Sequence, residues 1–230
     1  MDRGAAFLRT TRLLGDVDWW VYDRRGYGRT VADHPAELDG HIDDLVAVLE
    51  LVVRRAGQTA VVVGHSLGGT IALGAAHRRP DRVAAVVTYE APLTWEPWWP
   101  RRGPGGGSLE DDVPVVAAER FMRRVAGDDV WEALPAATRA RRLDEGRALV
   151  AELVSARRAA PFVASEITVP AVVARGSETD EYRRRAAAVL HGEVPDAELV
   201  LLDGADHGAH VSRPDDFATL VRTALARSGR

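Results

Sequence analysis

The chain has 230 residues, of which 46% are hydrophobic and 28% charged, and its net charge at pH 7 is -4. This length and apolar content suit one sizeable core that carries an inserted subdomain. The positive charge is spread along the chain on arginines, which predicts no basic face for nucleic acid. The absence of cysteine excludes disulfides, thiolate metal sites and a cysteine nucleophile.

The first residues, MDRGAAFLRTTRLL, lack the apolar segment and the small-residue cleavage site of a secretory signal. No stretch approaches the ~18 consecutive apolar residues that a membrane-spanning helix needs. We therefore expect a soluble, cytoplasmic protein with neither a membrane nor nucleic acid as a partner.

Strand-like and helix-like runs alternate along most of the chain, which predicts an α/β fold with a mostly parallel, doubly wound sheet. Apolar and β-branched runs favour strands at Asp18–Tyr22, Ala60–Val63, Val83–Tyr89, Ala171–Ala174 and Glu198–Leu202. Apolar residues at helical spacing favour helices at Ile42–Arg55, Gly69–His77 and Asp215–Ala226.

The alternation breaks between Thr94 and about Ser165. This segment contains a Trp-rich start, a Gly-rich loop with the sequence RRGPGGGS, and arginine-rich helical stretches such as Ala136–Arg158. Because connections between sheet strands are normally much shorter, we predict that it is an inserted helical cap. The expected organisation is a core at residues 1–93, a cap at 94–165 and the rest of the core at 166–230.

A serine lies between glycines where an expected strand meets an expected helix, in the stretch TAVVVGHSLGGTIAL at residues 59–73. Residues 64–68 read G-x-S-x-G, the pattern of a strand-to-helix turn that exposes the hydroxyl of its serine. Strand, turn and helix in register favour Ser66 as a nucleophile over a serine that merely fits a tight turn.

A serine hydroxyl is almost entirely protonated at neutral pH and needs a base before it can attack. His207 follows the last expected strand, so in a doubly wound sheet it would lie at the same carboxyl edge as Ser66. We expect His210 to be a half-exposed loop or helix-start residue and His65 to pack or hydrogen-bond beneath the turn. The remaining histidines are expected at the surface or in loops: His34, His41, His77 and His191.

Three motifs make the sequence resemble the α/β-hydrolase superfamily of esterases, lipases and related enzymes. They are GHSLG at residues 64–68, YDRRGYGRT at 22–30 and GADHGAHVSRP at 204–214. The second is similar to a family turn, D-x-R-G-x-G-x-S, with Thr30 in place of the usual serine, and we expect Gly26 and Gly28 to give it backbone freedom. The resemblance spans the whole chain and implies the order serine, acid, histidine along it.

Three carboxylates compete for the role of the acid that orients His207. Family members often place an aspartate three residues after a glycine that follows the fourth expected strand, but here that place is Thr179, between Glu178 and Asp180. Other members have a glutamate at the end of the strand after the serine helix, where this chain has Glu90. Either position would let a carboxylate accept the Nδ1 proton of the histidine. We favour Glu90, because a carboxylate at a buried strand end needs such a partner, whereas Asp180 could cap a helix.

Only 17 residues precede Asp18, whereas the family resemblance implies three earlier strands and a His-Gly loop after the third. We therefore expect an N-terminally truncated sheet, with Met1 an internal methionine of a longer reading frame. The residues before Asp18 would form the helix that follows the His-Gly loop. That loop supplies one oxyanion donor in the family. The backbone N–H of Leu67 remains as the other, and losing one donor typically costs ~100- to 1000-fold in rate.

Five aromatic side chains and one methionine gather at the start of the expected cap and within it: Trp95, Trp98, Trp99, Phe121, Met122 and Trp131. They would suit an apolar acyl or alcohol group, but the same rings could equally bury the cap against the core.

The sequence thus predicts a serine hydrolase whose partner is a small apolar ester or a related acyl compound. Ester, thioester, lactone, amide and carbon-carbon bond hydrolysis all remain open. The sequence has no phosphate-binding loop and no metal-ligand pattern of histidines, so we expect neither a cofactor nor a metal. The alternative is a catalytically inactive protein of the same fold that binds an apolar ligand.

Overall fold

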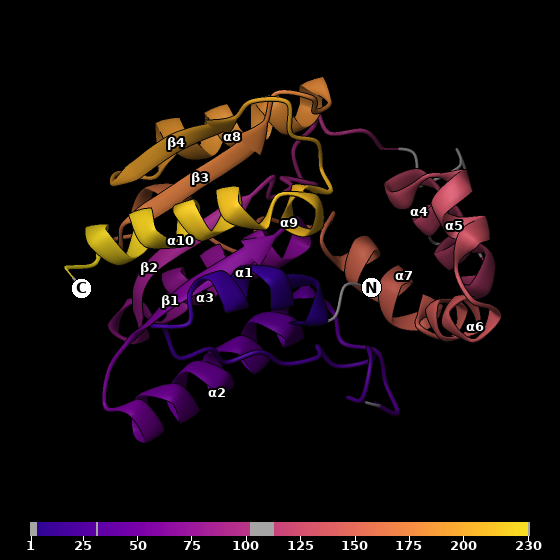
Figure 1. The fold of residues 1–230 in the computed structure, drawn as a ribbon, viewed down its shortest axis with the longest axis horizontal. Coiled ribbons are helices and arrows are strands. Elements are labelled where there is room, and N and C mark those ends of the chain that lie inside the picture. Colours follow the sequence, from indigo (N-terminus) through magenta and orange to yellow (C-terminus); the bar gives the residue numbers. More distant parts are fainter. Residues whose placement is uncertain (1–3, 31, 102–112, 230) are drawn as a thin grey trace. The chain divides into compact units, whose positions relative to one another are not determined.

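The computed structural model describes residues 4–30, 32–101 and 113–229 (Figure 1). The chain divides into two compact units. One contains the sheet and is built from Gly4–Val21, Ile42–Leu93 and Ala160–Arg230. The other contains Tyr22–His41 and Thr94–Ala159, so the segment expected as a cap shares its unit with the YDRRGYGRT motif.

The sheet has four parallel strands in the order β1-β2-β3-β4, which confirms the predicted α/β class. The strands are β1 (Ala60–His65), β2 (Val83–Tyr89), β3 (Ala171–Gly176) and β4 (Ala197–Leu202). The two central strands are almost fully buried, as expected when helices cover both faces of a parallel sheet. The register sets His65 of β1 opposite Tyr89 of β2, and Tyr89 opposite Ala174 of β3, so the carboxyl ends of these strands meet at one edge.

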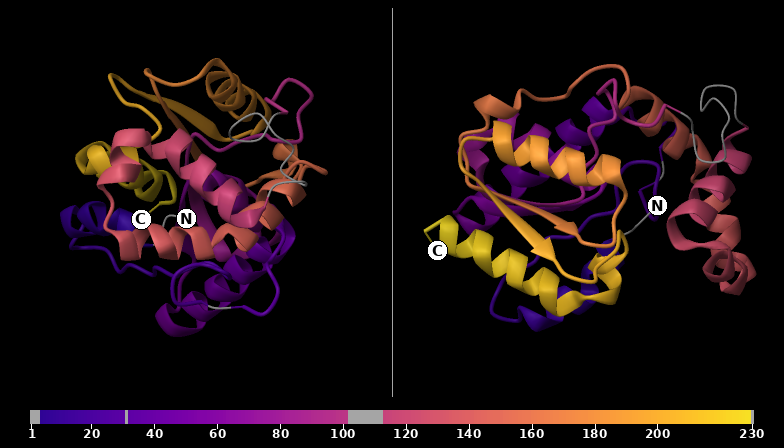
Figure 2. Two further views of the ribbon diagram at one scale, coloured as in Figure 1. Left: turned by 90° about the vertical axis from the view of Figure 1, so that its right-hand side faces the viewer. Right: turned by 90° about the horizontal axis from the view of Figure 1, so that it is seen from above.

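Helices flank this sheet, with α8 and α10 on opposite faces (Figure 2). The helices of the sheet unit are α1 (Leu8–Leu13), most of α2 (Leu38–Ala56), α3 (Leu67–Arg78), α8 (Glu181–Glu193), α9 (Ala209–Ser212) and α10 (Pro214–Arg227). Short 3-10 helices span Gly4–Phe7, Pro80–Arg82 and Ala164–Glu166. Over the ranges that the structure describes, no helix is long and apolar enough to cross a membrane.

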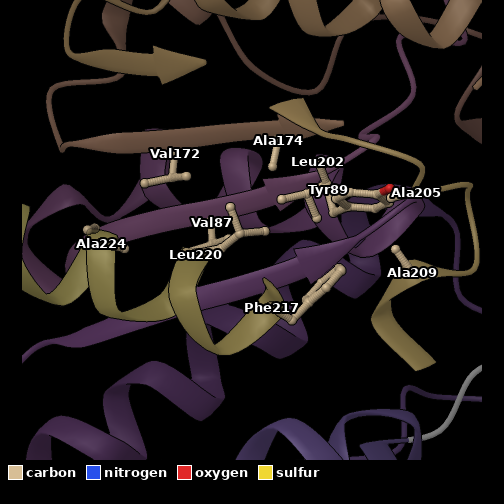
Figure 3. Close-up of a cluster of buried hydrophobic side chains, with 11 residues drawn as sticks. Val87, Tyr89, Val172, Ala174, Leu202, Ala205, Ala209, Phe217, Leu220 and Ala224 are labelled. Atoms are coloured by element: carbon tan, nitrogen blue, oxygen red, sulfur yellow. The ribbon is translucent and has the colours of Figure 1, made fainter. Parts of the chain in front are cut away.

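A buried apolar cluster of the sheet unit lies between the sheet and α10 (Figure 3). Val87 and Tyr89 of β2 and Val172 of β3 share a buried cluster with Phe217 and Leu220 of α10. Alternate residues of a strand face one side of a sheet, and residues three apart share a helix face, so the apolar spacing brings these side chains together. Each large apolar side chain buried here contributes about 1.5–3 kcal/mol to folding.

As far as the structure describes it, the second unit contains the YDRRGYGRT turn, the first residues of α2 and further helices of its own. Its helices are α4 (Pro114–Ala126), α5 (Asp128–Ala133), α6 (Ala136–Asp144) and α7 (Gly146–Ser155). Tyr27 is buried against Ala118 of α4 and Ala148 of α7, and a Cβ on Gly26 would lie 2.6 Å from the Ala148 side chain. Gly26 has a φ of 83°, so the turn needs glycine both for its backbone and for this contact. The Gly-rich stretch RRGPGGGS begins at Arg101 and otherwise lies outside the described residues.

Buried charges join the turn to α7 within this unit. Arg24 Nη1 lies 2.5 Å from Oε2 of Glu152, and His41 Nε2 lies 3.3 Å from the same oxygen. Burial opposes ionisation of Glu152, but the charge of Arg24 outweighs it and holds the pKa of the carboxyl well below its usual range. His41 is fully buried, so the expectation of a surface or loop residue was wrong. Its polar neighbour comes from a distant part of the sequence, which local patterning does not reveal.

The predicted strand Asp18–Tyr22 is not formed. A strand needs a neighbour for its backbone hydrogen bonds, and among the described residues no strand pairs with this segment. Instead, Val17 and Trp19 pack around Leu14 and Val221, and the indole N–H of Trp19 donates to the carbonyl of Leu14 at 3.3 Å. The strand prediction was therefore wrong, because an apolar run alone does not supply a pairing partner.

Candidate active site

Ser66 occupies a tight turn between β1 and α3. Its backbone angles, φ 52° and ψ -130°, lie in a region that residues other than glycine rarely adopt. The turn is fixed by backbone hydrogen bonds from Ser66 N–H to Tyr89 O at 2.8 Å and from Gly69 N–H to Ser66 O at 2.7 Å. A Cβ on Gly64 would lie 2.2 Å from the carbonyl oxygen of Gly68, so the strand and the helix approach too closely for any other residue there.

The loop between β4 and α9 carries His207 to the same edge of the sheet. The ring of His65, the residue before Ser66, lies with Nε2 2.8 Å from the carbonyl oxygen of His207. Because a carbonyl only accepts, the proton of His65 is on Nε2. The hydroxyl of Tyr89 donates to the carbonyl of Asp206 at 2.7 Å. The ends of β1 and β2 therefore both hold the histidine loop, as the doubly wound topology predicts.

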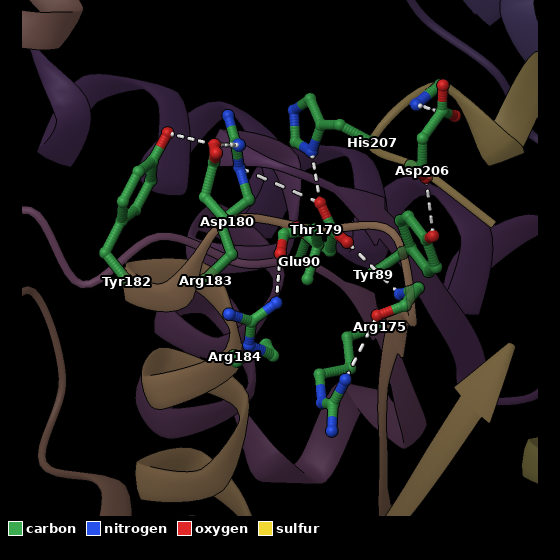
Figure 4. A network of polar contacts seen from close by, with 12 residues as sticks. Tyr89, Glu90, Arg175, Thr179, Asp180, Tyr182, Arg183, Arg184, Asp206 and His207 are labelled. Carbon is green, nitrogen blue, oxygen red and sulfur yellow. Dashed lines mark hydrogen bonds and ion pairs between the residues drawn. The ribbon is translucent and has the colours of Figure 1, made fainter. Parts of the chain in front are cut away.

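Glu90 lies directly after β2 and points at His207 (Figure 4). Its Oε2 is 2.6 Å from Nδ1 of His207, and its Oε1 accepts a 3.1 Å hydrogen bond from the backbone N–H of Gly176. The side chain is fully buried, and the φ of 51° is again in the left-handed region. The backbone N–H of Glu90 donates to the carbonyl of Ala174 of β3 at 2.9 Å, and this hydrogen bond helps to hold the strained conformation.

The electrostatics of this pair follow from burial and from the short hydrogen bond. Burial of the Glu90 carboxyl opposes its ionisation, but the hydrogen bond from His207 and the Gly176 amide outweigh burial and hold the pKa below its ordinary value. Burial lowers the pKa of His207, and the bond to Glu90 only partly offsets this. A neutral imidazole that donates from Nδ1 to a carboxylate leaves Nε2 free to accept a proton.

The other two candidate acids lie apart from this contact. Asp180 sits at the start of α8 with its side chain 54% exposed, and it accepts hydrogen bonds from the hydroxyl of Tyr182 at 2.6 Å and from Arg183. Glu178 is exposed and accepts from the hydroxyl of Ser177 at 3.3 Å. Of the three carboxylates that the sequence left open, the structure pairs Glu90 with His207.

Two further residues lie near the pair: Arg183, which was not identified from the sequence, and Thr179, which the sequence marked only as the occupant of the family's usual acid position. Arg183 of α8 places its guanidinium Nε 3.7 Å from Oε2 of Glu90. Thr179 is buried beside them at the end of the loop that follows β3. A pattern that could have pointed to Arg183 is its position one helical turn after Asp180, at the carboxyl edge where the sheet topology gathers polar residues.

The remaining histidine of this region, His210, is buried in α9 rather than half-exposed. Its ring stacks on His65, with centroids 3.8 Å apart and an interplanar angle of 18°. The expectation of a half-exposed residue was therefore wrong, because α9 turns the ring inward against Phe7 and Phe217. Among the described residues, no group of three or more His, Cys, Asp or Glu side chains is placed to hold a metal ion.

Leu67 is the first residue of α3, where a backbone N–H has no partner within the helix. Trp95, Trp98, Trp99, Phe121, Met122 and Trp131 belong to the helical unit. Trp95, Trp98 and Trp99 are half-buried, and the rings of the last two lie 6.0 Å apart. Phe121 and Met122 pack in the core of that unit around Tyr27, and Trp131 is also buried.

The sequence and fold of this chain are similar to those of known proteins. A family model described as the alpha/beta hydrolase family matches residues 3–220. The chain belongs to the α/β-hydrolase family. Members of this family are enzymes, and the curated relatives of this α/β-hydrolase are named as hydrolases and esterases.

Two curated relatives and one solved structure illustrate the likeness. The chain is 26% identical to 2-(acetamidomethylene)succinate hydrolase of Mesorhizobium japonicum over 84% of this chain and 73% of that protein. It is 26% identical to the pimeloyl-[acyl-carrier protein] methyl ester esterase of Yersinia enterocolitica over 91% of this chain and 83% of the other. The enol-lactonase structure from Burkholderia xenovorans is similar in fold, with a TM-score of 0.71 at 22% identity over 97% of this chain and 87% of that one.

Proposed function

We propose that this α/β-hydrolase is a serine hydrolase that cleaves a small apolar ester or a related acyl compound. In this proposal Ser66 is the nucleophile, His207 the general base and Glu90 the acid that orients it. The observation that carries the proposal is the 2.6 Å contact between Nδ1 of His207 and the buried Glu90, in a loop bound to the residue next to Ser66.

The proposed reaction proceeds through an acyl-enzyme. The Ser66 Oγ attacks the substrate carbonyl carbon while Nε2 of His207 takes the hydroxyl proton. The carbon–oxygen bond to the leaving alcohol then breaks, and the alcohol leaves with that proton. Water repeats the sequence: it gives a proton to Nε2, attacks the acyl carbon, and releases the carboxylic acid while Ser66 regains its proton. Throughout, Glu90 stabilises the imidazolium and fixes the tautomer.

The negative charge that develops on the substrate oxygen needs donors already in place. In this proposal, the N–H of Leu67 is one of them. It follows the nucleophile directly and lies at the start of α3, where the helix dipole favours a negative charge. A donor of this kind is worth about 2.7–4 kcal/mol in the transition state.

The names of the curated relatives support acyl chemistry but differ in the bond cleaved. One is named for a methyl ester and one for an acetamidomethylene compound. In the proposal, Trp95, Trp98 and Trp99 contact an apolar part of the substrate. Their amphipathic rings suit a group that is apolar at one end and polar at the other.

An active-serine probe tests the proposal directly. We expect a fluorophosphonate probe to add one covalent label to the full chain, and peptide mapping to locate that label on Ser66. We also expect the unlabelled protein to hydrolyse p-nitrophenyl butyrate and the labelled protein to have lost this activity. The matched control is Ser155→Ala, which removes a buried hydroxyl from the helical unit. Binding of apolar esters without labelling of Ser66 would overturn the proposal and support the inactive ligand-binding alternative.

A further inference from the structure

The Glu90 carboxylate has a second cation beside it, on α8. The guanidinium Nε of Arg183 lies 3.7 Å from Oε2 of Glu90, the oxygen that is also 2.6 Å from Nδ1 of His207. The Arg183 side chain is only 17% exposed. Dashed lines in Figure 4 trace the chain of contacts from Tyr182 through Asp180 and Arg183 to Glu90 and His207.

Neighbours on its own helix hold Arg183 at this position. Asp180 accepts a hydrogen bond from Nη1 of Arg183 and, at 2.6 Å, one from the hydroxyl of Tyr182. The guanidinium carbon also lies 5.0 Å from the centroid of the Tyr182 ring, within the range of a cation–π contact. Because a guanidinium stays protonated in proteins, these contacts fix a permanent positive charge beside the carboxylate.

We propose that Arg183 is a positioning residue of this site, which holds Oε2 of Glu90 toward His207 and favours the neutral imidazole that can accept the serine proton. The inference rests on the proposed roles of Ser66, His207 and Glu90. Asp180 has a part in it as well, since its carboxylate fixes Arg183 rather than orienting the histidine itself.

Several charged or titratable groups face the pair. They are His65 at the end of β1, Tyr89 at the end of β2, Asp180 and Arg183 at the start of α8, and His210 in α9. Asp206 precedes His207, and its carboxylate accepts a hydrogen bond from the backbone N–H of Gly208 at 2.9 Å. Glu90 favours the imidazolium, whereas Arg183 opposes it. The base is therefore held between a carboxylate that stabilises its charged form in the transition state and a cation that keeps it neutral at rest.

Geometry gives Arg183 a second effect. The Gly176 amide binds Oε1 of Glu90, and the guanidinium and the imidazole share Oε2. Each oxygen thus has at least one donor or cation, so rotation of the carboxylate breaks contacts on both sides. A buried carboxylate held in this way keeps Nδ1 of His207 protonated and Nε2 available.

The test compares Arg183→Met with Arg183→Lys, which keeps the charge, and with Arg185→Met, which removes the same charge from an exposed place on α8. Two readouts are the rate of fluorophosphonate labelling against pH and the titration of the His207 ring by NMR. We expect Arg183→Met to raise the midpoint of both curves by roughly one pH unit, because a nearby positive charge no longer opposes protonation. Arg183→Lys should keep the midpoint within a few tenths of a unit of the wild type, as should Arg185→Met.

A second variant provides another arm should Arg183→Met fail to fold. Arg183→Gln also removes the positive charge but keeps polar N–H donors, so the His207 midpoint should again rise by roughly one pH unit. A merely structural role would lower the labelling rate at every pH without moving the midpoint, and that result would overturn the inference. If Ser66 is not labelled at all, the proposed function fails, and the NMR titration still decides the role of Arg183 by itself.

Discussion

Ser66 and Glu90 share a left-handed backbone conformation. Both residues follow the last residues of neighbouring parallel strands, and both have φ near 50°, at 52° and 51°. Conformations of this kind cost about 1–3 kcal/mol each and persist where the surroundings enforce them. Here the Ser66 N–H bonds Tyr89 O, and the Glu90 N–H bonds Ala174 O, so the sheet itself supplies the enforcing contacts.

Replacement of either partner in the proton transfer should abolish ester hydrolysis. We expect Ser66→Ala and His207→Ala each to lower kcat by roughly 10⁴-fold or more, with the melting temperature little changed. Because the two side chains act as one unit, the double variant should be no worse than either single variant. The measurement is kcat for p-nitrophenyl butyrate, and losses that multiply in the double variant would contradict the assignment.

Replacement of each carboxylate by its amide should distinguish the roles of Glu90 and Asp180. Glu90→Gln leaves an amide that cannot accept the Nδ1 proton in the same way, so the imidazole takes the wrong tautomer, and we expect kcat to fall by about 10²- to 10⁴-fold. Asp180→Asn should change kcat at pH 8 less than about threefold, because Asp180 pairs with Arg183 and not with His207, and the imidazole is already neutral at that pH. The reverse order would assign the acid role to Asp180, and small losses in both variants would reject both residues.

At the scale of the elements, the junction of β1 and α3 depends on how closely the two approach. A Cβ on Gly64 would lie 2.2 Å from Gly68 O and 2.5 Å from Gly69 N, both backbone atoms that no side-chain rotation can move. A Cβ on Gly68 meets nothing within 4 Å. The same substitution at two glycines of one motif therefore has opposite steric consequences.

We expect Gly64→Ala to lower the free energy of unfolding by more than about 2 kcal/mol, because β1 and α3 must move apart. Gly68→Ala should be neutral or stabilising by roughly 0.5–1 kcal/mol, since alanine loses less conformational entropy than glycine within a helix. Urea unfolding of the two variants beside the wild type provides the comparison. Equal destabilisation by both would show that the close approach at Gly64 does not limit this junction.

At the scale of the whole molecule, buried carboxylates link folding to pH. Glu90 in the sheet unit and Glu152 in the helical unit both have pKa values below the ordinary range of a glutamate. Burial opposes ionisation of each, and His207 or Arg24 outweighs that opposition. A carboxyl whose folded pKa is depressed stabilises the fold above its unfolded pKa of about 4.3, and that contribution is lost as the pH falls through the folded pKa.

The free energy of unfolding should therefore fall steadily as the pH is lowered from about 5. Glu152→Gln should lower the free energy of unfolding at pH 7 by about 3–5 kcal/mol, because Arg24 is left buried without its anion. The free energy of unfolding of this variant should also depend less on pH in the acidic range. Glu193→Gln, at the exposed end of α8, is the matched control and should change neither. Urea unfolding at several acidic pH values measures these free energies. If the free energy of unfolding of Glu152→Gln fell with pH as steeply as that of the wild type, the role of that carboxylate would be refuted.

Local chemistry was enough to predict the fold class and the serine turn. Apart from Asp18–Tyr22, the apolar runs predicted strands and helices close to those observed, and G-x-S-x-G placed Gly64 where the backbone of β1 meets α3. Sequence alone determined these features because they depend on sterics and periodicity over a few residues. The roles of Ser66 and His207 remain proposals that the activity measurements test.

The tertiary structure decided what depends on partners far apart in the chain. The sequence left Glu90, Asp180 and Glu178 open, and only the folded sheet brings Oε2 of Glu90 to His207, because β2 and the loop after β4 end at the same edge. The predicted strand Asp18–Tyr22 failed for the same kind of reason, since strand formation requires a neighbour that an apolar run does not specify. Burial of His41 beside Glu152 and the approach of Arg183 to Glu90 likewise arise from contacts between separated segments, whose energies appear only when the chain has folded.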